Sequence, residues 1–156
     1  TLRGTSYGSA SIRDLLRMAS GIEFVENYTG NDDVAKLSRS VITGTPATTD
    51  LLKSYSRKFQ PGQKFNYSSL ETMAIGYLLK DVSGKTIAQL TKEWLWDPLG
   101  SEDEAYWLTS KEGMEGAYCC FAASPRDWAK IGLLFAKAGA MNGKTIVSSS
   151  FMSEAT

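Results

Sequence analysis

The chain has 156 residues, close to the usual length of one domain, and carries 17 Lys and Arg against 17 Asp and Glu, with no histidine. The balanced charge argues against a nucleic-acid-binding surface. The missing histidine excludes a Ser-His-Asp triad and a histidine-based zinc site within this chain. Acid–base chemistry would have to come from Asp, Glu, Lys, Tyr or Cys side chains, and we expect neither a metal nor a cofactor.

Capping signals and apolar spacing predict four helices in the first half of the chain. The first runs over 12–19 behind a Ser11 capping box, the second over 32–43, and a short third begins near Thr49. The fourth follows a capping box formed by Ser68 and Glu71. Its apolar positions recur at helical spacing, and Ser83-Gly84 ends it.

The second half mixes helices with short strands. A helix begins at Thr86 with Ile87, Leu90 and Trp94 facing inward, and two strands follow within 105–108 and 117–122. Ser124-Pro125 begins a helix whose predicted inward face is Trp128, Ile131, Phe135 and Ala138. After a turn at Asn142-Gly143, Ser148 to Ser150 cap one more helix. We therefore predict a single, mainly α domain over residues 1–156 with a small pair of strands.

No apolar run approaches the roughly 18 residues that a membrane-spanning helix requires, so we expect no membrane span. Cys119 and Cys120 are adjacent. Most disulfides need a larger Cα separation than one peptide step provides. We expect two small unpaired residues on a half-buried strand, in preference to a redox pair.

Tyr67 is the first candidate for chemistry. It lies between the Pro61-Gly62 turn and a predicted helix N-terminus, where the helix dipole favours negative charge. Because a phenol ordinarily ionises near pH 10, a tyrosine base needs a cation or a helix-end field beside it. The alternative role is a hydrophobic staple ahead of the Ser68 cap. Ser69, at the first helical position, could point into a pocket.

Several catalytic motifs are missing. No Ser or Thr is followed three residues later by Lys, and there is no Gly-x-Ser-x-Gly elbow, P-loop or dinucleotide fingerprint. The acidic runs Asp32-Asp33 and Glu102-Asp103-Glu104 are typical of helix starts and solvated loops. A nucleophile with its activating base is therefore not visible in these 156 residues.

Four segments, in order, resemble the serine β-lactamase and penicillin-binding-protein-like hydrolases. They are residues 12–21 (IRDLLRMASG), residues 61–69 (PGQKFNYSS, the place of a Tyr-x-Asn motif), residues 97–100 (DPLG) and residues 123–132 (ASPRDWAKIG). The segment 24–28 (FVENY) is similar to a loop of the class C-like carboxylesterases and the aminohexanoate-oligomer hydrolases. The resemblance implies the helical subdomain of the β-lactamase/transpeptidase-like α/β fold.

The resemblance also implies roles for four residues. Tyr67 would act as general base and as proton donor to the leaving group, beside the lysine of a Ser-x-x-Lys motif. Tyr28 would close over the substrate, and Ser69 and Tyr118 would line the substrate pocket. Ser69 stands where β-lactamases have Asn, which disfavours efficient β-lactam hydrolysis. The implied substrate is a small ester or amide.

The Ser-x-x-Lys motif and the third, Lys-Thr-Gly-like motif are expected before and after this chain. We therefore expect the central fragment of a bacterial serine hydrolase of the periplasm or cytoplasm, inactive by itself and able to self-associate through an exposed face. One alternative is a non-catalytic, stand-alone binding module derived from that fold. Another is an unrelated helical domain, which requires Tyr67 to lie far from Tyr28 and Tyr118.

Overall fold

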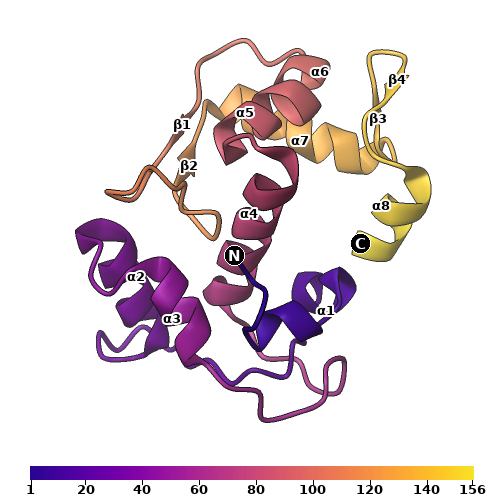
Figure 1. Ribbon diagram of the computed structural model, residues 1–156. Coiled ribbons are helices and arrows are strands. Elements are labelled where there is room, and N and C mark those ends of the chain that lie inside the picture. The colour runs from indigo at the N-terminus through magenta and orange to yellow at the C-terminus, as the bar shows by residue number, and fades with distance from the viewer. The chain divides into compact units, whose positions relative to one another are not determined.

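Local capping determines where most helices begin. The computed structural model describes residues 1–156 and is mainly helical, with two short antiparallel strand pairs (Figure 1). Its elements are η1 (Tyr7–Ser9), α1 (Ile12–Leu16), α2 (Asp33–Thr43), α3 (Thr48–Ser54), α4 (Ser69–Ser83), α5 (Ile87–Thr91), η2 (Lys92–Trp96), α6 (Asp97–Leu99), β1 (Tyr106–Trp107), β2 (Phe121–Ala122), α7 (Pro125–Ala136), β3 (Ala140–Met141), β4 (Lys144–Thr145) and α8 (Ser149–Ala155). No helix combines the length and the apolar character needed to cross a bilayer.

The chain forms two compact units. The first consists of residues 1–85 and 108–120, and the second of residues 86–107 and 121–156. Each unit is therefore built from two separate stretches of chain. That residues 1–156 form one domain stays a prediction.

Helix α4 is the central element of the first unit. Its Leu70, Met73 and Ala74 side chains are fully buried, and the helix packs against α1 and α2. The 108–120 segment of the same unit approaches α4 so closely that a Cβ added at Gly76 would lie 2.5 Å from the Cβ of Ala117. Glycine at position 76 therefore permits this packing.

The predicted cap of α4 is wrong, although the predicted helix is present. Ser68 precedes the helix, but its side chain makes no capping hydrogen bond and its Oγ is buried without a partner. Glu71 does not close a capping box either. Its Oε1 accepts hydrogen bonds from the Ser20 hydroxyl (2.6 Å) and the Ser20 amide (3.3 Å). Both side chains are buried, Ser68 just before the helix and Glu71 in its first turn.

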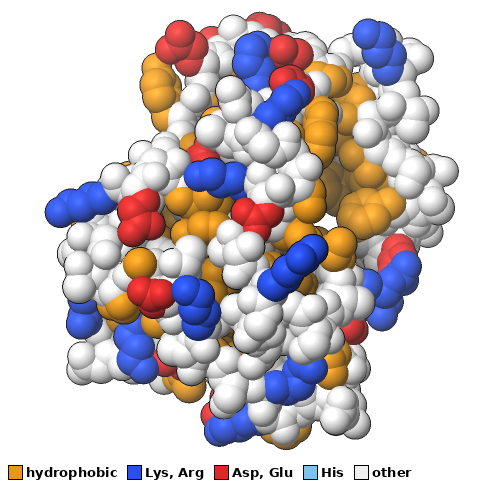
Figure 2. All heavy atoms as spheres, in the orientation of Figure 1, with side chains coloured by type: hydrophobic (Ala, Val, Ile, Leu, Met, Phe, Trp, Pro, Cys, Tyr) orange, Lys and Arg blue, Asp and Glu red, His pale blue; other side chains and the backbone are white.

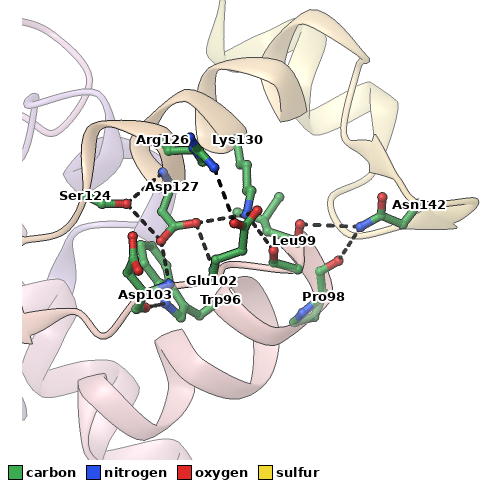
Figure 3. A network of polar contacts seen from close by, with 11 residues as sticks. Trp96, Pro98, Leu99, Glu102, Asp103, Ser124, Arg126, Asp127, Lys130 and Asn142 are labelled. Carbon is green, nitrogen blue, oxygen red and sulfur yellow. Dashed lines mark hydrogen bonds and ion pairs between the residues drawn. The ribbon is translucent and has the colours of Figure 1, made fainter.

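In the second unit, Asp127 joins the start of α7 to the 100–103 loop (Figure 3). Its fully buried carboxylate accepts hydrogen bonds from the amides of Glu102 and Asp103, each at 3.0 Å, and from the Lys130 ammonium at 3.0 Å. Burial opposes ionisation, but these bonds outweigh it and hold the pKa of Asp127 well below its ordinary value. The network is structural and contacts none of the predicted site residues.

Two predicted helix faces in this unit are correct only in part. Ile87 and Leu90 are buried as predicted, and Ile131 packs against the core. Trp94 is 58 % exposed, and Trp96 is buried in its place, because residues 92–96 form a π-turn that changes the angular spacing of the side chains. On α7, Trp128 and Phe135 are about half exposed, whereas Leu134 packs with Leu99 and Met141. Asp127 and Leu134, the two buried residues of α7, lie two helical turns apart on the same face.

Candidate functional site

A cavity of about 300 Å³ lies in the first unit, beside the N-terminus of α4. All four predicted site residues line it: Tyr28, Tyr67, Ser69 and Tyr118. They come from three separate segments of the chain. Sequence spacing alone could not show that these segments meet. A larger cavity of about 650 Å³ in the second unit is lined by none of them.

Asn66 positions Tyr67 at the cavity. Its side-chain amide donates to the Phe24 carbonyl and accepts from the Phe24 amide, both at 3.0 Å, while its backbone amide donates to the Met18 carbonyl at 2.8 Å. This clamp fixes the irregular segment that leads into α4. Tyr67 itself is 54 % exposed at the cavity, so it does not serve as a buried staple.

Asp32 shapes the loop that carries Tyr28. The buried Asp32 carboxylate accepts hydrogen bonds from the amides of Asn27 (3.0 Å), Thr29 (3.3 Å) and Ala35 (3.1 Å). These bonds hold Tyr28 in the left-handed region, at φ 58°, which is uncommon for a bulky residue. Tyr28, 74 % exposed, therefore lines the cavity from a loop that the Asp32 carboxylate holds in place.

Glu26 is a site residue that the sequence analysis missed. Its Oε2 accepts a hydrogen bond from the Ser69 amide at 2.8 Å, and its Oε1 accepts one from the Ser69 hydroxyl at 2.7 Å. The same Oε1 accepts the phenol of Tyr28 at 2.7 Å. The Glu26 carboxylate thus takes the place that we predicted for Ser68 and caps α4 from another segment. The only sequence signal was an acidic residue two positions before Tyr28.

The expectation of unpaired cysteines is wrong. Cys119 and Cys120 form a disulfide across adjacent residues, with a Cα separation of 3.7 Å, and both line the cavity next to Tyr118. The Leu108 amide donates to the Cys120 carbonyl at 3.0 Å and the Cys119 amide donates to the Gly116 carbonyl at 2.9 Å. The disulfide therefore forms part of a tight turn that closes one wall of the cavity.

The cavity wall carries little formal charge. No Lys or Arg side chain is among its lining residues, and Glu26 is its one charged side chain. The hydroxyls of Tyr67 and Ser69 therefore have no cationic side chain beside them in the cavity wall. The cavity can position a small molecule between aromatic and aliphatic side chains.

The chain is similar to a known protein family and to several of its members. The family model described as Beta-lactamase matches residues 2–148. The 6-aminohexanoate-dimer hydrolase of Paenarthrobacter ureafaciens is 24 % identical over 153 residues, which cover 94 % of this chain and 39 % of that protein. A protein named "Putative D-alanyl-D-alanine carboxypeptidase" of Escherichia coli K12 is 29 % identical over 100 residues, which cover 64 % of this chain and 22 % of that protein.

Solved structures show the same fold. The structure of "Putative 6-aminohexanoate-dimer hydrolase from Bacillus anthracis" superposes with a TM-score of 0.86 at 24 % identity and covers 98 % of this chain and 42 % of that one. The octameric penicillin-binding protein homologue from Pyrococcus abyssi gives 0.63 at 19 % identity, covering 92 % and 37 %. The chain thus spans about two-fifths of the length of these relatives, and the interpretation as an unrelated helical domain is wrong.

Proposed function

Because the chain belongs to the β-lactamase family, we propose that it is the central, helical part of a serine hydrolase acting on ester or amide bonds through an acyl-enzyme. One observation supports this most strongly. The four residues to which the family resemblance gives roles, Tyr28, Tyr67, Ser69 and Tyr118, all line the same cavity. The helical fold shared with the relatives supports the same proposal.

In the proposed reaction, a serine from a Ser-x-x-Lys motif outside these 156 residues attacks the substrate carbonyl. Tyr67, with the motif lysine beside it, accepts the serine proton as the new C–O bond forms. It then donates that proton to the leaving amine or alcohol as the old bond breaks. Water hydrolyses the resulting ester and returns the serine. Tyr28 covers the substrate, while Ser69 and Tyr118 contact it.

The test compares this chain with the product of the complete reading frame. We expect a fluorophosphonate probe to label a serine in the complete protein and no serine among these 156 residues. Tyr67→Phe in the complete protein should reduce acylation by roughly two orders of magnitude or more, since general acid–base catalysis typically contributes that much. Labelling of a serine within this chain would contradict the proposal.

The second candidate is a non-catalytic binding module derived from the same fold. It is favoured by the absence of any cation from the cavity wall and of a Ser-x-x-Lys sequence from the chain. The two candidates differ in one property of the gene. A reading frame with an upstream in-frame Ser-x-x-Lys supports the hydrolase, whereas a complete frame without one supports the binding module.

We also propose that the chain self-associates through exposed apolar side chains. Phe65 is 68 % exposed and Val82 is 72 % exposed. Apolar atoms lie between the interspersed positive and negative side chains in Figure 2. Exposed apolar surface promotes association, and the penicillin-binding protein homologue from Pyrococcus abyssi is octameric. Light scattering after size exclusion, over a range of concentrations, tests this, and a monomer at all concentrations would contradict it.

A further inference from the structure

Glu26 has no role in the reaction proposed above, yet it makes three hydrogen bonds at the cavity. They come from the Ser69 amide, the Ser69 hydroxyl and the Tyr28 phenol, at 2.8, 2.7 and 2.7 Å. All three partners are donors, and all three belong to the predicted site residues Ser69 and Tyr28. The carboxylate therefore connects the loop that carries Tyr28 to the start of α4, over 43 residues of sequence.

We propose that Glu26 is a positioning residue that sets the hydrogen-bonding polarity of the cavity and holds Tyr28 across it. A serine hydroxyl has one hydrogen. Because Ser69 gives that hydrogen to Glu26, only oxygen lone pairs of Ser69 are available to a ligand. Tyr28 likewise gives its hydrogen to Glu26. The asparagine that β-lactamases have in place of Ser69 would instead offer an amide donor at this point.

This polarity favours a ligand that brings its own donor. A substrate amide N–H can donate to the Ser69 oxygen, whereas an ester of the same acyl group has an oxygen at that position and would face a lone pair. The nearby Glu26 charge and the absence of any cation from the wall strengthen the preference. This consequence rests on the proposed hydrolase function, whereas the positioning role can be tested without it.

The hydrogen bond from Tyr28 gives the positioning role a spectroscopic signature. Its bond to the Glu26 carboxylate stabilises the neutral phenol and raises the pKa of Tyr28 to about 12. Glu26→Gln keeps the size of the side chain and removes the charge. At pH 10.5 we expect Tyr28 to remain protonated in the wild type. In E26Q about three-quarters of it should be ionised, as for an ordinary tyrosine with a pKa near 10.

The measurement is the 13Cζ chemical shift of Tyr28 in protein labelled with 13C-tyrosine, assigned with Tyr28→Phe. The chain offers a matched control in the second unit, where Tyr106 donates to Glu104 at 2.7 Å with the same two-residue spacing. Glu104→Gln should change the ionisation of Tyr106 and leave Tyr28 unaffected. Equal ionisation of Tyr28 in the wild type and in E26Q would overturn the proposal.

A second readout keeps the test valid if E26Q retains part of the network. Glu26→Ala removes both acceptors, so the Ser69 amide should exchange with solvent at least tenfold faster, while the amides in the middle of α4 remain protected. If the whole spectrum shows unfolding, Tyr28→Phe removes only the phenol bond and should leave the Ser69 amide protected. Unchanged Ser69 exchange in a folded E26A protein would also overturn the proposal.

In the complete enzyme, E26Q should lower kcat/KM for an amide substrate roughly tenfold more than for the ester of the same acyl group, the effect of losing about one hydrogen bond. E104Q should alter neither. An equal effect of E26Q on kcat/KM for the amide and for the ester would refute the proposed hydrogen-bonding polarity of the cavity. If the complete protein hydrolyses neither substrate, the proposed function fails, while the Tyr28 and Ser69 measurements still decide whether Glu26 positions them.

Discussion

Replacing Gly76 with alanine tests the packing that holds one wall of the cavity against α4. In an open helix this change is stabilising by about 1 kcal/mol, because alanine loses less backbone entropy than glycine. At position 76, however, the new Cβ would lie 2.5 Å from the Cβ of Ala117 and 3.3 Å from Cε of Met114. The first distance is about 1 Å shorter than a normal carbon–carbon contact of roughly 3.5–4.0 Å.

Gly132 provides the matched control. It also lies within a helix, α7, but a Cβ added there would meet nothing within 4 Å. Gly132→Ala should therefore show only the stabilising effect of about 1 kcal/mol. Overpacking costs typically about 1–3 kcal/mol. Since the helix-propensity gain is common to both variants, G76A should be less stable than G132A by about 1–3 kcal/mol, which is the cost of the close contact.

The assay must report on the correct unit. All four tryptophans, at positions 94, 96, 107 and 128, lie in the second unit, so their fluorescence during urea unfolding suits Gly132. The first unit is better followed by hydrogen exchange of the α4 amides. In the double variant G76A/A117G the clash is removed, and a favourable coupling of about 0.5–3 kcal/mol is expected. If G76A stabilises α4 as much as G132A stabilises α7, the reasoning is refuted.

Three further predictions concern caps and buried carboxylates. Thr86 caps α5 through a complete capping box, so Thr86→Ala should lower the free energy of unfolding in urea by about 1 kcal/mol. Ser68→Ala should lower it clearly less, because the Ser68 side chain makes no capping hydrogen bond. An equal loss in both variants would show that Ser68 does cap α4. Because the pKa of Asp127 is held below its unfolded value, its contribution to stability is present above about pH 4 and lost as the pH falls. Asp127→Asn should be less stable than the wild type at pH 7, and its unfolding midpoint should fall less as the pH is lowered below about 4. Midpoints that fall equally in both proteins would contradict this. Burial raises the pKa of Glu71, whose Oε2 has no partner. Ionisation of Glu71 therefore lowers the free energy of unfolding as the pH rises from about 4.3 through the folded-state pKa of this group. Glu71→Gln should therefore gain stability relative to the wild type between pH 4 and pH 7, and the prediction fails if the difference is constant across that range.

Features that depend on neighbouring residues could be predicted from the sequence. The capping boxes at Ser11 and Thr86 and the serine cap at Ser124 are present, and each involves partners within three residues. The strand pair also forms, with Tyr106 opposite Ala122. The caps need no tertiary information because their hydrogen bonds close within a single helical turn.

The errors arise where a distant residue or an irregular turn decides the structure. α4 is capped by Glu26, 43 residues away, and no local pattern distinguishes that carboxylate from an exposed one. The π-turn at residues 92–96 exchanges Trp94 for Trp96 in the core. The disulfide joins two residues in a tight turn, where Cys120 has a left-handed backbone with φ 70°, and no sequence signal predicts that turn.

The site residues could be predicted only through the family resemblance. Residue chemistry favoured a staple role for Tyr67 and drew no attention to Tyr28 or Tyr118. Their meeting in one cavity depends on the clamp at Asn66, the loop held by Asp32 and the approach of the 108–120 segment to α4. Each of these is a long-range or loop interaction, for which periodicity carries no information.

The 108–120 segment has a consequence for how this protein can be dissected. The chain passes from one unit to the other at three points, after residues 85, 107 and 120, so no single proteolytic cut separates the units. The ends of the segment are held side by side by the pairing of Trp107 with Phe121. A continuous gene for the second unit therefore needs only a short turn joining residues 107 and 121. Insertions or deletions within the segment would alter the cavity wall while leaving that junction in register.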